Sequence, residues 1–211
     1  MLRKPATGAD RDRFIAGGVF ALGLAIVGGY AISQMTTPAM AQAEDGPGPN
    51  LVIEVDGQAK GQIVIDMLPD VAPKHVAQIT ALAKEGQYDG VVFHRVIDGF
   101  MAQTGDVAFG KAGGDTSMAG MGGSSLPDLP AEFSDISFDR GIVGMARSQD
   151  PNSANSQFFI MFAPGDFLNG QYTVVGRVIS GMEVVDAIKK GDGGNGEVTN
   201  PDQMAKVTVA E

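Results

Sequence analysis

Two stretches of the sequence hold side chains that suit chemistry without a covalent intermediate. The first, 93–106, sets the guanidinium of Arg95 among large apolar residues and one amide, Gln103. The second, 152–160, adds the amide of Gln157 and two phenylalanines. A permanent positive charge beside amides and apolar walls can bind and polarise a substrate, but it offers no activated nucleophile. This set predicts a reaction in which no covalent bond breaks.

Other kinds of catalytic centre find little support. The chain has no cysteine and two histidines, so a zinc site would rest mostly on carboxylates, and no Gly-x-Ser-x-Gly sequence supports a serine triad. We expect His75 on the surface of a helix, and His94 on the strand face opposite to Arg95. The glycine-rich stretch 110–130 lacks the Lys-Ser/Thr of a phosphate loop, and 191–196 lacks the spaced carboxylates of a calcium loop. We interpret them as a surface loop and a turn, and predict neither metal nor cofactor.

The charge and cysteine content limit the kinds of molecule that the protein can bind and the chemistry that it can perform. Of the 15 basic and 25 acidic residues, four of each lie within 1–50, so the net charge of −10 falls on the rest of the chain. Such acidity argues against a nucleic-acid partner and favours solubility. The absence of cysteine removes disulfide and thiolate chemistry, which makes the chain indifferent to an oxidising compartment. With 211 residues, the chain can form one well-cored domain with an appendage.

The elements that must position these residues are mostly strands. Leu51–Val55 and Gln62–Met67 predict a hairpin, because turn-forming residues separate them. Pro73 begins a helix with apolar residues at three- and four-residue spacing, and Gly86 is placed to end it. A second short helix is predicted at 182–189. Further strands are predicted at 91–96, 99–103, 141–146, 157–162, 173–179 and 204–209.

The N-terminal segment has the pattern of an export element. Residues 14–32 are uncharged and follow a basic segment, and as a helix they would extend roughly 28 Å, close to the thickness of a bilayer core. Ala39–Ala41 and Ala41–Ala43 both match a signal cleavage site, so cleavage and retention stay open. We predict a signal or anchor at 1–43, a linker at 44–50 and a folded domain at 51–211. The domain would then be periplasmic or otherwise extracytoplasmic, either soluble or anchored to the inner membrane through 14–32.

The two stretches resemble the signature segments of the cyclophilins. Residues 93–106 agree with the pattern Phe-His-Arg-Val-Ile-x-Gly-Phe-Met-x-Gln-Gly-Gly-Asp at every fixed position but one, where Thr104 replaces a glycine. Residues 152–160 resemble the second segment of the family and 167–176 the third. The resemblance extends over essentially all of 51–209, and three ordered motifs with this spacing are highly specific.

This resemblance implies a fold and an activity. The fold is mainly β, a closed antiparallel eight-stranded β-barrel with two capping α-helices, here preceded by an N-terminal hydrophobic helix. The activity is peptidyl-prolyl cis/trans isomerisation of proline-containing polypeptides without a cofactor. We expect the protein to be a monomer, although the sequence alone does not determine the oligomeric state. A proline-binding module or holdase chaperone, with incidental turnover, is the alternative. A structural part of an envelope complex is a more distant one.

The resemblance also implies roles for individual residues. Arg95 corresponds to the catalytic arginine, assisted by Gln103. The implied substrate contacts are Phe100, Met101, Ala146, Arg147, Gln157, Phe159, Phe167, Leu168 and Tyr172. Three of these differ from many eukaryotic members: Arg147 stands in place of asparagine, Phe167 of tryptophan and Tyr172 of histidine. Because phenylalanine lacks the indole N–H donor, we expect weakened cyclosporin binding.

Overall fold

The computed structural model describes residues 44–192 and 194–211. The predicted export segment 14–32 and its cleavage sites lie outside the described residues, so these remain predictions. Within the described part of the chain, no helix combines the length and the apolar character needed to span a bilayer.

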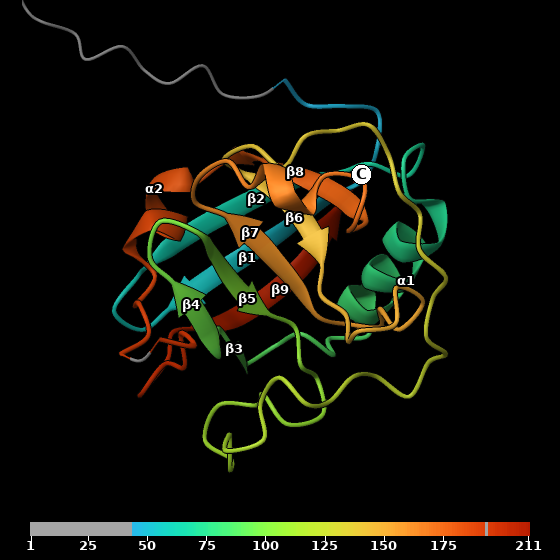
Figure 1. Ribbon diagram of the computed structural model, residues 1–211. Coiled ribbons are helices and arrows are strands. Elements are labelled where there is room, and N and C mark those ends of the chain that lie inside the picture. The colour runs from blue at the N-terminus through green and yellow to red at the C-terminus, as the bar shows by residue number, and fades with distance from the viewer. Residues whose placement is uncertain (1–43, 193) are drawn as a thin grey trace, which may run out of the picture. The chain divides into compact units, whose positions relative to one another are not determined.

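The predicted hairpin is confirmed. Strands β1 (Asn50–Asp56) and β2 (Gly61–Met67) pair antiparallel, and β1 also pairs with the last strand, β9 (Gln203–Ala210). Burial along β1 alternates, with Leu51, Ile53 and Val55 inside. This period of two is the pattern expected where a sheet covers a core on one face only. As a result, the first and last strands lie side by side (Figure 1).

Among the described residues, nine strands form one curled antiparallel sheet instead of the predicted closed barrel of eight. The remaining strands are β3 (Val91–Val92), β4 (Arg95–Ile97), β5 (Met101–Thr104), β6 (Ile142–Met145), β7 (Phe158–Met161) and β8 (Val174–Ser180). Their order is β3-β9-β1-β2-β8-β6-β7-β5-β4, so β3 and β4 are the two edges and the barrel is open.

The strand predicted at 91–96 is interrupted at its middle and forms two strands, β3 and β4. This interruption gives nine strands in place of eight and leaves β3 and β4 at the two edges of the sheet. The Phe93 amide donates to the Asp202 carbonyl, and the His94 carbonyl accepts from Val198. On the far side of the break, the Val96 amide donates to Gly196. On one side, the backbone of Phe93, His94 and Val96 is therefore bonded by the segment 196–202, which lies a hundred residues later in the sequence. On the other side, β4 pairs with β5.

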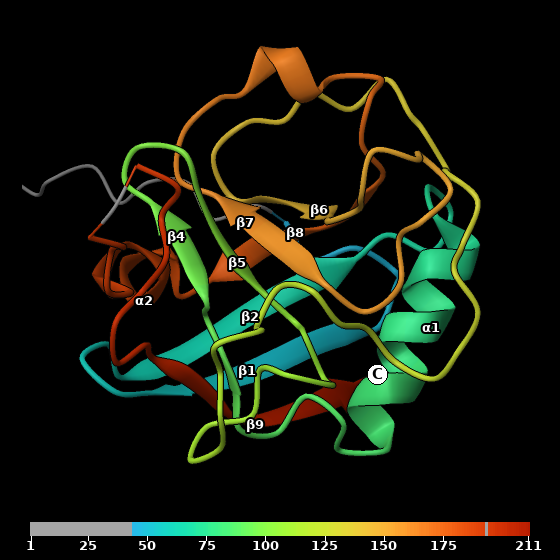
Figure 2. The same ribbon diagram turned by 60° about the horizontal axis from the view of Figure 1, so that its bottom comes forward.

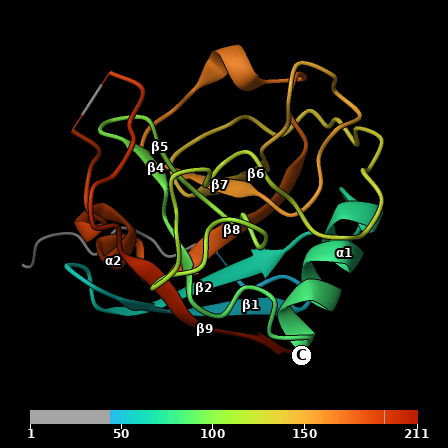
Figure 3. The same cartoon turned by 90° about the horizontal axis from the view of Figure 1, so that it is seen from below.

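The two α-helices in the part of the chain that the structure describes lie at opposite ends of the sheet (Figures 1, 2 and 3). Helix α1 (Pro73–Lys84) begins with proline, which lacks the amide hydrogen that a first helical turn leaves unpaired. It packs Val76, Ile79 and Leu82 into the core. Helix α2 (Met182–Ala187) ends earlier than predicted, because Ile188 has left the helical conformation and the Lys189 amide donates to the Asp202 carboxylate.

Two apolar clusters form the interior of the region 44–211, residue 193 excepted. The larger one lies between α1 and the sheet and includes Ile53, Phe93 and Phe158. The smaller one lies under the segment that carries the short 3₁₀ turn η1 (Asp166–Leu168), which stands at the top of Figure 2. Its buried members are Met101, Phe138, Phe159, Met161, Leu168 and Val174. Three of these, Met101, Phe159 and Leu168, are predicted substrate contacts, so the smaller cluster is the base of the candidate site.

The prediction for His75 is wrong: its side chain is fully buried. Its Nδ1 lies 2.6 Å from Oε2 of Glu132, and this carboxylate also accepts the amide hydrogens of His75 and Lys74 in the first turn of α1. A helix start leaves amide donors unpaired, and no side chain of the cap residue serves them here. Glu132 takes that role from 57 residues away, which no local pattern could indicate.

This contact predicts a pH-dependent contribution to stability. Partial burial acts to raise the pKa of Glu132, but the hydrogen bonds from His75 and Lys74 outweigh it and hold the pKa below the ordinary 4.5. A lowered folded-state pKa stabilises the protein above the unfolded-state value, and the benefit fades as the pH falls through the folded-state value. We expect Glu132→Gln to lower the free energy of unfolding by about 1 kcal/mol at pH 7.

Urea unfolding of the full-length protein between pH 7 and pH 3 measures this difference. Glu54→Gln is the matched control, because Glu54 is exposed on β1. The gap between wild type and Glu132→Gln should shrink below about pH 4.5. A gap that persists or widens in acid contradicts the prediction.

Candidate active site

A cavity of about 240 Å³ gathers ten of the eleven residues named from the sequence. We call it the first cavity. It is lined by Arg95, Phe100, Met101, Gln103, Ala146, Arg147, Phe159, Phe167, Leu168 and Tyr172. The eleventh residue, Gln157, lines a second cavity of about 350 Å³, which shares Gln103, Ala146 and Arg147 with the first. The two cavities thus share a wall, and together we call them the groove.

Strand register places the polar and apolar sides of the first cavity. Arg95 on β4 lies opposite Gln103 on β5, and Gln103 lies opposite Phe159 on β7. Residues directly opposite one another project from the same face of a sheet, so the three side chains form a row. Gly144 on β6 continues the row opposite Phe159, and a Cβ there would lie 2.5 Å from ring atoms of Phe138 and Phe159. Glycine at 144 therefore makes room for the aromatic floor.

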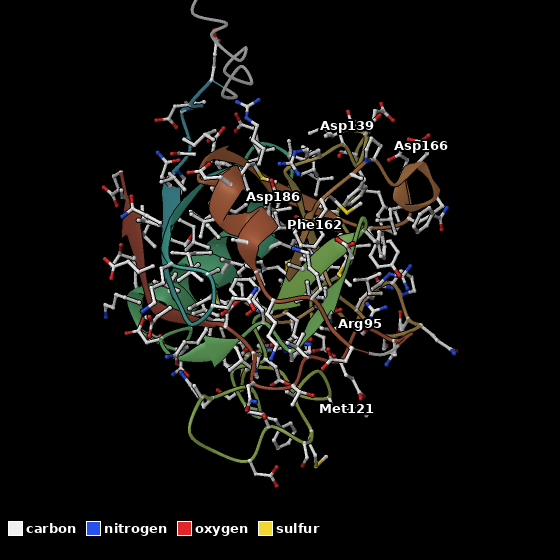
Figure 4. The ribbon with its side chains drawn as sticks, turned by 90° about the vertical axis from the view of Figure 1, so that its left-hand side faces the viewer. Arg95, Met121, Asp139, Phe162, Asp166 and Asp186 are labelled. Carbon is white, nitrogen blue, oxygen red and sulfur yellow. The ribbon has the colours of Figure 1, made fainter. Side chains whose placement is uncertain are left out.

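A chain of side-chain hydrogen bonds orients the guanidinium. Nη1 of Arg95 donates to Oε1 of Gln103 over 3.1 Å, and Nε2 of Gln103 donates to Oε1 of Gln157 over 3.0 Å. Nε2 of Gln157 donates in turn to the carbonyls of Gly120 and Gly122. Nε of Arg95 donates to the Asn195 carbonyl over 2.9 Å. Figure 4 shows Arg95 beside β4 and β5, with Met121 of the long loop below it.

The loop that contains Gly120 and Gly122 is held in place by a buried carboxylate, that of Asp106. One oxygen accepts the amides of Ala108 and Phe109, and the other accepts those of Gly120 and Gly122, over 2.7 to 3.1 Å. Asp106 is fully buried. Local sequence patterns indicate neither this role nor the contribution of the loop, because the composition of 110–130 predicts a surface loop. The sequence signal for this role is an acidic residue, Asp106, that lies among apolar residues and has no basic neighbour in the sequence.

Thr104, the departure from the family pattern, is accommodated within the sheet. Its side chain is fully buried, and its hydroxyl donates to the Val92 carbonyl over 2.9 Å. A buried hydroxyl costs little when it has such a partner. The substitution therefore ties β5 to β3 and leaves the neighbouring Gln103 in place.

Aromatic side chains form the apolar wall. Phe100 and Phe167 have ring centroids 5.4 Å apart, and Phe159 contacts Phe138 and Tyr172 at 5.8 and 5.9 Å. Phe159 and Leu168 are buried and form the floor, whereas Phe167 is 70% exposed and stands at the rim. Such a surface suits a small apolar ring that enters from solvent.

His94 lines neither cavity. Burial lowers the pKa of its imidazole, with a smaller opposing effect from Asp106. A neutral ring packed beside Gly120 is thus a structural element, as expected from its position next to Arg95. Among residues 44–192 and 194–211, no three acidic or histidine side chains gather as a metal centre would require.

Comparison with known proteins identifies the family. The family described as cyclophilin type peptidyl-prolyl cis-trans isomerase/CLD matches residues 51–209. The chain belongs to the cyclophilins. A probable peptidyl-prolyl cis-trans isomerase of Brucella suis is 64% identical over 152 residues, which cover 71% of this chain and 78% of that protein. A peptidyl-prolyl cis-trans isomerase of Arabidopsis thaliana is 40% identical over 143 residues, covering 65% and 82%.

Solved cyclophilin structures share the fold. A cyclophilin from Hirschia baltica superposes with a TM-score of 0.63 at 26% identity, covering 78% of this chain and 74% of that one. A cyclophilin of Cryptosporidium parvum, crystallised in the presence of the dipeptide Ala-Pro, gives a TM-score of 0.65 at 25% identity, with coverages of 77% and 99%. The protein is thus a cyclophilin-type peptidyl-prolyl cis/trans isomerase, the enzyme class that the sequence motifs implied.

The hydrogen-bond chain makes Gln157 a test of how this cyclophilin orients its arginine. Gln157→Leu keeps the side-chain volume but leaves Gln103 and the carbonyls of Gly120 and Gly122 without their partner. We expect kcat/KM for a proline peptide to fall about tenfold, equivalent to about 1.4 kcal/mol, the magnitude of one net hydrogen bond. Gln58→Leu is the control, because Gln58 bonds only outside the groove. Unchanged turnover in Gln157→Leu would show that the hydrogen bonds through Gln157 and Gln103 do not position Arg95.

Proposed function

We propose that Arg95 is the catalytic group of this isomerase and that its substrates are proline-containing segments of unfolded or extended polypeptides outside the cytoplasm. The observation that supports this most is the position of the guanidinium at the polar edge of an apolar cavity. It is held there by Gln103 and by the Asn195 carbonyl. Among the ion pairs of the described residues, none involves Arg95. Its charge is therefore available to a substrate.

The reaction requires stabilisation of a twisted peptide bond and nothing else. Rotation about an X-Pro bond breaks amide resonance against a barrier of ~18–20 kcal/mol and takes tens to hundreds of seconds unaided. In the twisted state the prolyl nitrogen regains a lone pair, so a donor aimed at it stabilises that state more than either planar isomer. The bonds to Gln103 and Asn195 use Nη1 and Nε of Arg95. In the proposed mechanism Nη2 of Arg95 donates to the prolyl nitrogen.

The magnitudes are consistent with this mechanism. A charge-assisted hydrogen bond contributes roughly 1.5–3 kcal/mol, and more in a dry site. Raising a rate near 0.01 per second to about 10 per second needs ~4 kcal/mol, at about 1.36 kcal/mol for each factor of ten. One bond held in place before the substrate arrives, together with fixation of the proline ring, supplies that amount.

The other groove residues hold the substrate on either side of the rotating bond. In this proposal the proline ring packs on Phe100, Met101, Phe159 and Leu168, which offer no competing donor. Gln103 and Gln157 bind backbone groups of the substrate, and Phe167 covers the ring from the exposed rim. With the ring fixed, the preceding carbonyl is the part that turns. The Cryptosporidium parvum cyclophilin crystallised in the presence of Ala-Pro supports the assignment of proline-containing substrates.

Substitution of Arg95 tests the catalytic proposal. Arg95→Ala should lower kcat/KM by one to two orders of magnitude, in line with the loss of about 1.5–3 kcal/mol. Arg95→Lys should recover little of this, because a lysine has no planar fork to satisfy Gln103 and a substrate together. Exchange NMR on a proline peptide gives the rate, and Lys60→Ala removes an equivalent charge from an exposed position. Equal rates in wild type and Arg95→Ala would eliminate Arg95 as the catalyst.

The same variants separate catalysis from a holdase role. The apolar walls remain in Arg95→Ala, so that variant should still bind the peptide while turnover is lost. If wild type and Arg95→Ala both bind proline segments and neither accelerates the exchange, the protein acts as a binding module. We further propose that it acts as a monomer, which sedimentation of the purified protein measures.

The proposed location depends on the front of the chain. We propose that 14–32 directs the domain out of the cytoplasm, where the chain is released or stays anchored to the inner membrane. N-terminal sequencing of the protein recovered from its native cell distinguishes the two forms. A start at Gln42 or Glu44 indicates release, and a start at Met1 in the membrane fraction indicates an anchor. Recovery of an uncleaved chain from the cytoplasm would contradict export.

A further inference from the structure

The groove is positively charged in an otherwise acidic domain. The side chains that line its two cavities include two arginines, Arg95 and Arg147, and no acidic residue. The acidic excess of the chain, a net charge of −10, therefore lies elsewhere on the molecule. A local charge opposite in sign to that of its surroundings is a feature that a charged substrate can recognise.

Arg147 is fixed in place where the cavities meet. Its Nη1 donates to the carbonyls of Ser148 and Gln149, and its Nη2 donates to the carbonyl of Gln171 over 3.0 Å. The guanidinium carbon lies 4.3 Å from the ring centroid of Tyr172. These contacts join the segment after β6 to the segment after η1. Neutral carbonyls and an aromatic ring hold the side chain in position without neutralising its charge.

Acidic residues beside the groove line neither cavity, and hydrogen bonds engage several of them, among them the buried Asp106. Oδ1 of Asp150 accepts the Asn152 amide. Asp166 lies on η1, well above Arg95 in Figure 4. Glu197 forms a backbone β-bridge with Arg95, and no ion pair joins their side chains. Within the described ranges, no ion pair includes Arg147.

We propose that Arg147 is a specificity-determining residue that favours substrates with an aspartate or glutamate close to the proline. This inference rests on the proposed function, because it takes the proline ring to occupy the first cavity. An extended chain advances roughly 3.3 Å per residue, so a side chain one to three residues from the proline reaches the shared wall of the cavities. There a carboxylate would meet the guanidinium of Arg147. Because the site is open to solvent, the preference should be modest and sensitive to salt.

A substrate-by-enzyme cycle isolates this contact. Peptides that differ only by Glu or Gln, at each of the three positions on either side of the proline, are compared with the full-length protein in a mild detergent. At the best position we expect wild type to favour Glu about threefold to tenfold in kcat/KM at low salt. Arg147→Gln should reduce this ratio to about one or below. Raising the ionic strength to 1 M, where the Debye length is about 3 Å, should largely remove the wild-type preference.

Two further variants distinguish charge from loop architecture. Arg147→Lys keeps the charge but loses the fork that joins Ser148 and Gln171, so it should retain much of the Glu preference even if overall turnover falls. Lys60→Ala removes a positive charge outside the groove and should leave the ratio unchanged. If Arg147→Gln and Arg147→Lys lower turnover equally while the Glu/Gln ratio stays at the wild-type value, Arg147 is a structural clamp only and the inference fails.

The outcome for wild type separates this inference from the proposed function. If wild type accelerates exchange of the peptides but shows no Glu preference at any position, the specificity inference is overturned and the isomerase assignment of the groove stands. If wild type accelerates none of the peptides, the proposed function itself fails.

Discussion

The geometry of the groove depends on one buried negative charge. A carboxylate without a counter-ion is expensive to bury, and Asp106 is tolerated because four backbone amides solvate it in place of water. Those amides come from both ends of the loop that runs from Ala108 to Gly122, so the loop can satisfy the charge only when it is folded back on itself. Glycine at 122 is needed for this, since a Cβ there would lie 2.6 Å from an oxygen of Asp106.

The loop fixes the orientation of Gln157, which in turn fixes that of Gln103 and then that of Arg95. The Gly120 and Gly122 carbonyls can only accept, so the Gln157 amide must present its nitrogen to them and its oxygen to Gln103. Gln103 then has its oxygen left for the arginine. Each amide is thereby restricted to one of its two orientations. The guanidinium is held before any substrate arrives, which is the condition for electrostatic stabilisation without reorganisation.

The sequence predicted those parts of the fold whose causes are local. The alternation in 51–55 and the proline at 73 are sufficient to predict a hairpin and a helix start, because period and backbone chemistry act within a few residues. The family motifs also named the residues of the groove, and the ten that line the first cavity do lie together.

The sequence did not predict features whose partners lie far along the chain. The break at Phe93 and His94 depends on backbone groups at 198 and 202, and the burial of His75 depends on Glu132. The glycine and serine residues of 110–130 favour a solvated loop, although Asp106 binds its middle, at Gly120 and Gly122, against the site. In each case a hydrogen-bond partner remote in sequence overrides the local preference.

The pairing of β1 with β9 has a consequence for how this protein is made. Strand β1 gains β9 as its second neighbour only after about 150 further residues have been synthesised, and Asn195, which holds Nε of Arg95, is also synthesised late relative to β1. A nascent chain lacking its final segment therefore has neither a completed sheet nor an oriented guanidinium. The arginine is therefore oriented only in a chain that has been synthesised as far as the strand that completes the sheet.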